Sequence, residues 1–270
     1  MKKFTDIKYL LATRTDVPVF ERQLILSHTL DHPRSWLIAN DTDGISEHDA
    51  HDYHTQLTRR EGGEPIAYII GYKEFWKHRF TVNTATLIPR PETELLVELA
   101  LSARAATPCR VLDLGTGSGA IAVSLADERR QWSVLGTDIS AAALNVARGN
   151  SRSLPNLSFV QGCWTDPLAL QAFDMIVSNP PYIAPDDDHL QGLKHEPRGA
   201  LVADKAGLSD IERIITGSQK VLCSGGTLVL EHGYCQQEAV CRTLQVAGYE
   251  HIEKFTDLGG IPRAVRAKTL

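Results

Sequence analysis

The four residues Asn179-Pro180-Pro181-Tyr182 place hydrogen-bond acceptors and an aromatic ring within one short turn. Two consecutive prolines carry no N–H and hold the residues before them in extended geometry, so the Asn179 side-chain oxygen and the Pro180 carbonyl are available to a planar NH2 group. Tyr182 can supply an aromatic wall over that group. The pattern predicts a site for an amide or amino nitrogen where the apolar stretch 173–178 ends. A proline-rich turn that only ends a strand is the structural alternative.

A second pattern lies upstream, where a buried strand predicted over 110–114 runs into a glycine-rich turn and then an apolar helix. Glycines at such a turn let the backbone approach a ligand closely and leave helix N–H groups pointing into a crevice. Their spacing is G-x-G-x-G without the ending of the dinucleotide fingerprint, which favours S-adenosylmethionine over NAD. The residues concerned are Asp113, Gly115, Thr116, Gly117, Ser118 and Gly119.

An acidic residue, Asp138, ends the next predicted strand, 133–137. It follows the glycines by about twenty residues, the separation at which a βαβ unit brings a carboxylate to the ribose hydroxyls of a nucleotide. We therefore predict that Asp138 binds ribose. The alternative is that it only caps the helix that opens at Ser140.

Together these residues resemble the release-factor glutamine methyltransferase family, also called the HemK or PrmC family, which uses S-adenosylmethionine. The resemblance covers nearly the whole chain. The Asn-Pro-Pro-Tyr run is shared with enzymes that methylate the amino group of DNA adenine, whereas the Ile-Pro-Arg-Pro-Glu-Thr segment at 88–93 is far more restricted. The matching segments are 63–68, 74–76, 87–94, 113–119, 179–182 and 196–198.

The resemblance implies methyl transfer from S-adenosylmethionine to the side-chain amide nitrogen (N5) of the glutamine in the Gly-Gly-Gln motif of peptide chain release factors. It implies that Asp113 anchors the cofactor turn, that residues 115–119 pass close to the methionine moiety, and that Trp164 contacts the adenine side. The residues expected to bind the substrate are Asn179, Pro180, Pro181 and Tyr182. Asn179, Pro180 and Tyr182 are the expected catalytic residues, and Asn179 also borders the cofactor.

Some positions depart from this pattern or have a second interpretation. Cys163 precedes Trp164 where an acidic residue is common in the family, so a polar contact to the adenine amino group is absent or comes from elsewhere. Trp164 could equally be a core aromatic. Arg90 and Glu92 stand out as charges between prolines, and we interpret them as a structural clasp, an ion pair or a carboxylate at a helix start. The acidic run 186–188 is expected on a mobile surface loop.

Composition and charge limit the function classes. The chain has 270 residues and a formal net charge of -5 with a pI near 6.1, which disfavours a nonspecific nucleic-acid binder. Its five cysteines contain no Cys-x-x-Cys pair, so we expect no metal site and no disulfide. No segment reaches membrane-spanning length, and the N-terminus lacks the apolar core of a signal peptide. We expect a cytoplasmic monomer that acts on a protein and has no direct need for nucleic acid.

Two kinds of periodicity divide the chain. Apolar residues recur at helical spacing over 1–71, with breaks at Pro18 and at His32-Pro33, which predicts a small N-terminal helical domain. We assign substrate recognition to it, and we predict a β-hairpin or linker over 72–90. Over 91–270 strands and helices alternate, which predicts an α/β domain with a mostly parallel sheet. The resemblance specifies a Rossmann-like class I methyltransferase domain with seven strands.

The proposed chemistry is in-line methyl transfer to an amide nitrogen that two oxygen acceptors orient, without a strong general base. Other functions would also use some of these motifs. Glutamine methylation of a ribosomal protein and amino methylation of adenine use the same acceptors on another target. An NAD-dependent oxidoreductase would use only the glycine turn and leaves the residues from Asn179 to Tyr182 without a role. A noncatalytic interaction protein is disfavoured because both motifs are intact.

Overall fold

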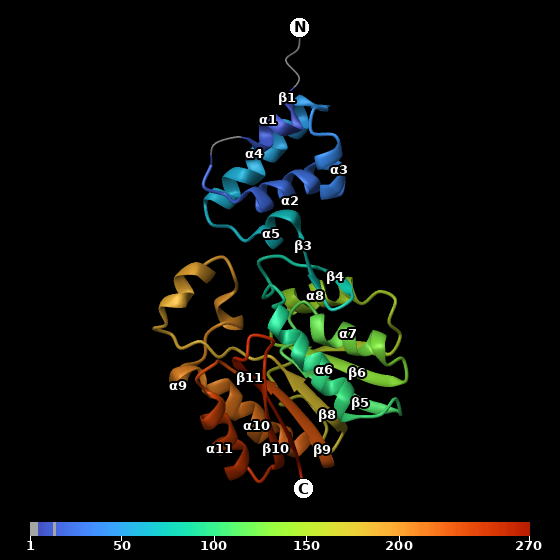
Figure 1. Ribbon diagram of the computed structural model, residues 1–270. Helices are drawn as coiled ribbons and strands as arrows, with labels where there is room; N and C mark the ends of the chain where they lie inside the picture. The colour runs from blue at the N-terminus through green and yellow to red at the C-terminus, as the bar shows by residue number, and fades with distance from the viewer. Residues whose placement is uncertain (1–4, 13–14) are drawn as a thin grey trace. The chain divides into compact units, whose positions relative to one another are not determined.

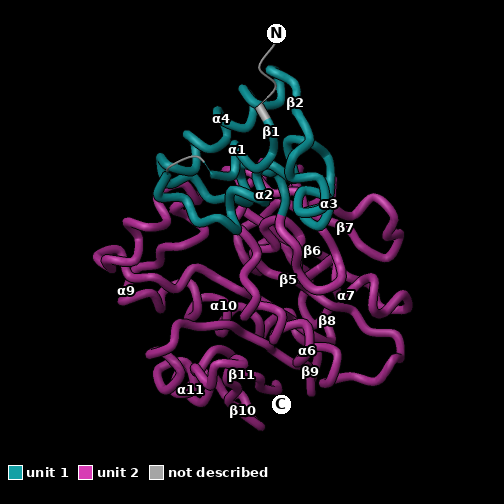
Figure 2. Tube along the Cα trace, turned by 45° about the horizontal axis from the view of Figure 1, so that its top comes forward, with its two compact units in different colours: residues 1–72 teal, residues 73–270 magenta. Residues whose placement is uncertain are grey.

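The computed structural model describes residues 5–12 and 15–270. The chain divides into two compact units, residues 1–72 and residues 73–270 (Figure 2). No helix in the described part of the chain is long and apolar enough to cross a lipid bilayer.

The N-terminal unit is helical around its own apolar core, which includes Ile25, Leu26 and Tyr53. Two helices begin directly after the predicted breaks at Pro18 and Pro33, because proline has the φ of a helix start and needs no N–H partner there. A pair of two-residue strands was not predicted, since two residues are too short to show a strand period. The elements are β1 (Thr5–Asp6), α1 (Ile7–Leu11), α2 (Val19–Thr29), α3 (Arg34–Ala39), β2 (Gly44–Ile45), α4 (Glu47–Glu61) and α5 (Ile66–Ile70).

Within residues 72–90 the structure has two paired strands, β3 (Tyr72–Phe75) and β4 (His78–Thr81). Phe75 and Phe80 are each 1% exposed, and their rings meet edge to face with centroids 6.0 Å apart. Both rings belong to the apolar core of the C-terminal unit. The aromatic residues of this segment thus fix the hairpin to the domain that follows it.

The C-terminal unit alternates helices and strands, as the sequence predicts (Figure 1). Its first part contains η1 (Pro91–Thr93), α6 (Glu94–Ala103), β5 (Cys109–Leu114), α7 (Ala120–Glu128), β6 (Trp132–Asp138), α8 (Ala141–Asn150), β7 (Leu157–Gln161) and β8 (Phe173–Ser178). Its second part contains η2 (Asp188–Leu193), η3 (Arg198–Ala200), α9 (Asp204–Gly207), α10 (Ser209–Val221), β9 (Leu222–Glu231), α11 (Gln237–Val246), β10 (Glu250–Thr256) and β11 (Pro262–Lys268). The acidic run 186–188 leads into η2 instead of forming a plain loop.

Seven strands form one sheet in the order β10-β11-β9-β8-β5-β6-β7. The strand pairs from β7 to β9 are parallel, and only β11 runs against its two neighbours. The prediction of an α/β fold with a mostly parallel seven-stranded sheet is confirmed. The connection order reverses between β5 and β8, and the crevice outside the carboxyl ends of two such strands is where ligands bind in open α/β sheets.

Both faces of the sheet are covered because side chains alternate along each strand. Val111 and Val177 pack in a core with α6 and α7. Leu112 and Ile176, each one residue away, pack in a second core with α10 and α11. Helices on both faces leave the ends of the strands as the accessible part of the sheet.

Candidate active site

The turn after β5 contains three glycines with left-handed backbone torsions. Gly115, Gly117 and Gly119 have φ values of 71°, 55° and 84°, a region that side chains with a Cβ rarely adopt. At Gly119 an added Cβ would also lie 3.2 Å from the Cβ of Ala147. At Gly117 an added Cβ would meet no atom within 4 Å. The backbone at Gly117 therefore borders open space, which permits close approach of a ligand.

Asp113, in β5, is completely buried and holds this turn. Its Oδ2 accepts the Thr116 hydroxyl at 2.6 Å and the Ala122 N–H at 3.2 Å. Its Oδ1 is buried and has no hydrogen-bond partner among the described residues. Burial raises the pKa of Asp113 to about 7, which the bonds from Thr116 and Ala122 oppose and the nearby Asp138 carboxylate reinforces. A buried carboxyl oxygen without a donor is suited to a cationic group of a ligand.

Asp138 ends β6 and is tied to the same turn. Its Oδ2 accepts the Gly117 N–H at 2.9 Å, and its Oδ1 accepts the Ser140 N–H at 2.8 Å. Burial raises its pKa, against these two backbone hydrogen bonds. Each carboxylate oxygen has a further lone pair, so the contact to Ser140 does not prevent Asp138 from binding ribose hydroxyls. The next residue, Ile139, exposes 68% of its surface beside this carboxylate.

Trp164 lies in the loop after β7, with its ring edge against the glycine turn. A Cβ on Gly115 would be 3.1 Å from Cζ3 of Trp164. Its indole Nε1 donates to Oδ1 of Asp210 at 3.1 Å, which fixes the ring, and the ring packs partly buried against the core under α10. The two interpretations of Trp164 are compatible, because the same indole borders both the core and the turn.

Asn179 follows β8, the strand next to β5 in the sheet. The Ser178 hydroxyl donates to the Leu114 carbonyl at 2.7 Å and so joins the two strand ends. The Asn179 Nδ2 donates to Oγ1 of Thr93 at 3.0 Å, while Oδ1 has no donor among the described residues. Pro180 and Pro181 are buried. The side chain of Asn179 is thus held by its NH2 group and keeps its oxygen available.

Tyr182 is held at both its hydroxyl and its backbone. Its hydroxyl donates to Oε1 of Glu231, at the end of β9, at 3.1 Å. Burial raises the pKa of Tyr182, and the Glu231 charge adds to this effect. Its carbonyl accepts from Nε2 of Gln236 at 3.0 Å, and the same Nε2 donates to Ala206. The tyrosine ring is therefore set in place by β9 and by the turn that leads into α11.

Arg90 forms an ion pair, but its partner is not the neighbouring Glu92. Its Nη2 lies 2.5 Å from Oε1 of Glu196, whose Oε2 accepts the Ile88 N–H at 3.0 Å. Glu196 is 6% exposed. The pair joins the segment before η1 to the segment before η3, which supports the structural interpretation of Arg90.

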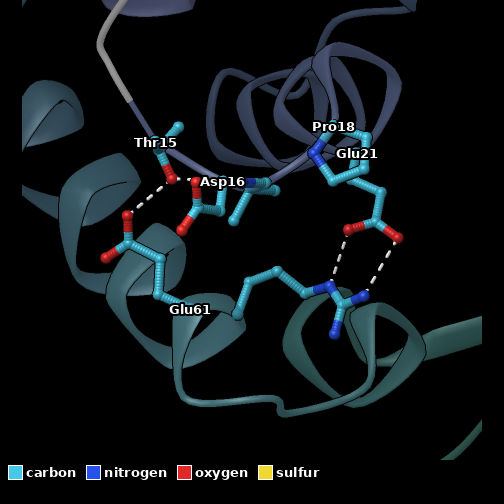
Figure 3. Close-up of a pocket in the computed structure, with 7 residues that line it drawn as sticks. Thr15, Asp16, Pro18, Glu21 and Glu61 are labelled. Carbon is cyan, nitrogen blue, oxygen red and sulfur yellow. Dashed lines mark hydrogen bonds and ion pairs between the residues drawn. The ribbon is translucent and has the colours of Figure 1, made fainter.

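A separate open pocket of about 690 Å³ lies within the N-terminal unit (Figure 3). Two of its carboxylates are engaged: Glu61 accepts the Thr15 hydroxyl at 2.6 Å, and Glu21 pairs with Arg60 at 2.6 Å. None of the residues predicted to act in catalysis or cofactor binding lines it. The candidate active site therefore remains at the strand ends of the C-terminal unit.

Comparisons with known proteins identify the family of both parts of the chain. Residues 107–257 match the family model described as a methyltransferase domain, and residues 5–71 match the model described as the PrmC N-terminal domain. The release factor glutamine methyltransferase of Bordetella pertussis is 46% identical over 266 residues, which cover 96% of this chain and 97% of that protein. The one from Escherichia coli is 43% identical over 249 residues, 91% of this chain and 90% of that protein. The chain belongs to the release factor glutamine methyltransferase family.

The fold of this family member is also found in solved structures. A ribosomal protein L11 methylase from Lactobacillus delbrueckii subsp. bulgaricus superimposes with a TM-score of 0.52 at 18% identity, covering 70% of this chain and 84% of that chain. At that identity the likeness concerns the fold alone. It agrees with the class I methyltransferase architecture that the sequence motifs predict.

Sequence reasoning did not identify the residues that support the Asn-Pro-Pro-Tyr run. Thr93, Glu231 and Gln236 contact Asn179 or Tyr182 in space and are far from them along the chain. Glu231 carried a usable signal, because an acidic residue that ends an apolar strand lies at the same sheet edge as Asp138. Neither composition nor periodicity gives a sign that Thr93 or Gln236 belongs to the site.

Proposed function

We propose that this chain transfers a methyl group from S-adenosylmethionine to the side-chain amide nitrogen of the glutamine in the Gly-Gly-Gln motif of peptide chain release factors. The observation that carries the proposal is the free acceptor of Asn179, whose NH2 group is engaged by Thr93 at the strand ends beside the glycine turn. The identity of 40–46% to release factor glutamine methyltransferases over most of the chain supports the same substrate.

The residues around the glycine turn fit the cofactor. S-adenosylmethionine supplies, when bound, an electrophilic methyl group on a positively charged sulfonium, and it also carries an ammonium group, ribose hydroxyls and adenine. The unpartnered Oδ1 of Asp113 would stabilise the positive charge, directly or through water. Asp138 would accept from the ribose hydroxyls. Trp164 and the exposed Ile139 offer apolar surface to adenine.

The residues after β8 position the substrate amide. An amide nitrogen is a weak nucleophile because its lone pair is delocalised into the carbonyl. When Asn179 Oδ1 and the Pro180 carbonyl each accept one N–H, they direct the nitrogen toward the methyl group and stabilise the positive charge that develops on it. Tyr182 restrains the plane of the amide. Its hydroxyl donates to Glu231, so Tyr182 acts as a wall and not as a base.

The test is methyl transfer from radiolabelled S-adenosylmethionine to purified substrates. We expect label in an intact release factor and none in a variant whose Gly-Gly-Gln glutamine is replaced by alanine. A purified ribosomal protein mixture and adenine-containing DNA serve as competing targets. Label in DNA or in ribosomal proteins, with an unlabelled release factor, would overturn the proposal.

We further propose that the enzyme acts in the cytoplasm as a monomer and without nucleic acid. Every residue assigned to catalysis or cofactor binding belongs to residues 73–270 of one chain, and the net charge of -5 does not favour binding to a polyanion. Light scattering of the active protein tests its oligomeric state. Nuclease treatment of the methylation assay tests the need for nucleic acid.

A further inference from the structure

Asn150, the last residue of α8, joins the glycine turn (115–119) to the β3–β4 hairpin. Its side-chain Nδ2 donates to the Ser118 carbonyl at 2.9 Å and to the Thr81 carbonyl at 3.1 Å. Its Oδ1 accepts the Thr81 N–H at 2.9 Å. Thr81 ends β4, and Ser118 stands between two glycines of the turn. One side chain therefore links two segments that are remote from each other in the sequence.

The Asn150 carboxamide pairs with Thr81 as a neighbouring strand would. A peptide group of a sheet gives its partner one donor and one acceptor, and the planar side-chain amide offers the same pair to the N–H and the C=O of Thr81. The second hydrogen of Nδ2 is then used by Ser118. The side chain has one orientation only, because turning it over would set its NH2 group against the Thr81 N–H.

The bond to Ser118 fixes the last peptide group of the glycine turn. The N–H of this group, on Gly119, donates to the Thr116 carbonyl at 2.8 Å, and its C=O accepts from Asn150. Ser118 is 3% exposed, so water does not readily replace the side-chain donor. Gly119, at a φ of 84°, has a wider choice of backbone conformations than other residues. Asn150 holds the turn in one of them.

The hairpin is a rigid support for this link. Phe75 and Phe80 anchor it in the apolar core of the C-terminal unit. At its bend, Nε1 of Trp76 donates to Oε1 of Glu128 at 2.7 Å. Glu128 ends α7, the helix that follows the glycine turn. The hairpin therefore holds the turn and its helix at two points, through Asn150 at Ser118 and through Trp76 at the far end of α7.

We propose that Asn150 is a positioning residue for cofactor binding, and that it couples the glycine turn to the hairpin. The inference rests on the proposed function, because it takes the glycine turn as the place where S-adenosylmethionine binds. A backbone segment that must become ordered when a ligand binds lowers the affinity, whereas a segment that is already ordered does not. Asn150 orders the turn before the cofactor arrives.

The decisive experiment compares the Kd for S-adenosylmethionine in Asn150→Asp and in the wild type, by isothermal titration calorimetry. Aspartate keeps an acceptor for the Thr81 N–H, but it loses the NH2 group and sets a carboxylate oxygen against the Ser118 carbonyl. We expect the Kd to rise at least about tenfold. An added negative charge would by itself favour a cationic cofactor, so the charge alone predicts the opposite change.

Asn156→Asp is the matched control, because Asn156 is also half-buried and also holds backbone carbonyls together. Its Nδ2 donates to the carbonyls of Ala126, Arg129 and Trp132 at 3.0, 3.3 and 3.0 Å, which joins the end of α7 to the start of β6. This control should lower the melting temperature at least as much as Asn150→Asp and leave the Kd within about twofold of the wild type. An unchanged Kd in Asn150→Asp, or an equal rise in both variants, would overturn the inference.

A second measurement uses the wild type, and it decides the matter if Asn150→Asp does not fold. Coupling between two sites is reciprocal, so a cofactor that stabilises the turn should also stabilise the hairpin end. We expect hydrogen–deuterium exchange of the Thr81 amide to slow at least about threefold when S-adenosylmethionine saturates the protein. The reference is the Arg110 amide at the start of β5, which also donates to a side-chain oxygen, Oδ2 of Asp174, at 2.8 Å. No change at Thr81, or an equal change at both amides, would contradict the coupling.

Neither measurement uses a protein substrate, so the coupling and the proposed substrate are tested separately. Weaker cofactor binding in Asn150→Asp, together with a wild type that leaves the release factor unlabelled, would refute the proposed substrate alone. A labelled release factor, together with an unchanged Kd in Asn150→Asp, would refute the coupling alone.

Discussion

Cofactor affinity is predicted to depend on the ionisation of Asp113. Its pKa is raised from 3.8 to about 7 by burial, and its Oδ1 has no partner among the described residues. A cationic cofactor favours the ionised carboxylate, so binding shifts Asp113 toward its charged form. At about pH 6 only about one tenth of the free protein carries this charge, and at about pH 8 about nine tenths does. The Kd should therefore be about tenfold weaker at the lower pH.

The raised pKa of Asp113 also predicts how the stability of the cofactor-free protein changes with pH. A folded-state pKa above the unfolded value contributes stability that is present below the unfolded pKa and is lost as the pH rises through the folded one. For Asp113 the loss occurs from about pH 4 to about pH 7. A shift from 3.8 to about 7 corresponds to about 4 kcal/mol at full ionisation. Asp113→Asn should accordingly raise the melting temperature of the free protein at about pH 8.

Isothermal titration calorimetry with S-adenosylmethionine at about pH 6, 7 and 8 tests the reasoning. In buffers of different ionisation enthalpy, the wild type should release about one proton on binding at the lowest pH. Asp113→Asn should bind S-adenosylmethionine more weakly, and its Kd should lose the pH dependence that Asp113 causes. Asp138 is unchanged in this variant, and its pKa is also raised, so it accounts for pH dependence of the Kd that remains. A Kd that is flat across this range, or an identical slope in Asp113→Asn, would refute the assignment.

Three further changes test other parts of the site. Asn179→Ala should lower kcat roughly a hundredfold, with little change in the Kd for the cofactor by calorimetry, because one aligned acceptor acts mainly in the transition state. Gly207→Ala should destabilise the fold by roughly 2 kcal/mol or more in urea unfolding, because a Cβ there would lie 2.0 Å from the Tyr182 carbonyl oxygen at a φ of +82°. Its control, Gly149→Ala, has free space and should be neutral or stabilising. Residues 73–270 alone should bind cofactor and methylate a Gly-Gly-Gln peptide, but lose at least about tenfold in kcat/KM for an intact release factor; equal losses on both substrates would contradict a recognition role for the N-terminal unit.

The sheet and its binding edge could be predicted because their signals are local. The strand 110–114 has three apolar residues and runs into glycines, and 174–178 is followed closely by a proline pair, so each strand and its end can be recognised within a short window. Parallel strands then bring their carboxyl ends to one edge without further information. The short 3-10 helices and the two-residue strands carry too few residues for a period to appear.

The supports of the site could not be predicted because they arise from the folded chain. Thr93 and Asn179 are 86 positions apart, and Tyr182 and Glu231 are 49 apart. The hydrophobic pattern says that β8 and β9 are strands, but a hydrogen bond between their end residues depends on strand order and register. Arg90 is a second example. Its charge stands out in the sequence, but only the structure shows that it pairs with Glu196.

The distribution of charge around the site suits the reaction of the family. Asp113, Asp138 and Glu231 are carboxyl groups at the ends of strands in one sheet, and burial raises the pKa of each. Methyl transfer to an amide moves positive charge from the sulfonium to the nitrogen, and negative potential near both ends of that path stabilises the charge throughout. The atoms proposed to touch the amide, on Asn179 and Pro180, are neutral oxygens. They can hold both N–H groups without removing a proton, while Glu231 lies behind them and accepts the Tyr182 hydroxyl.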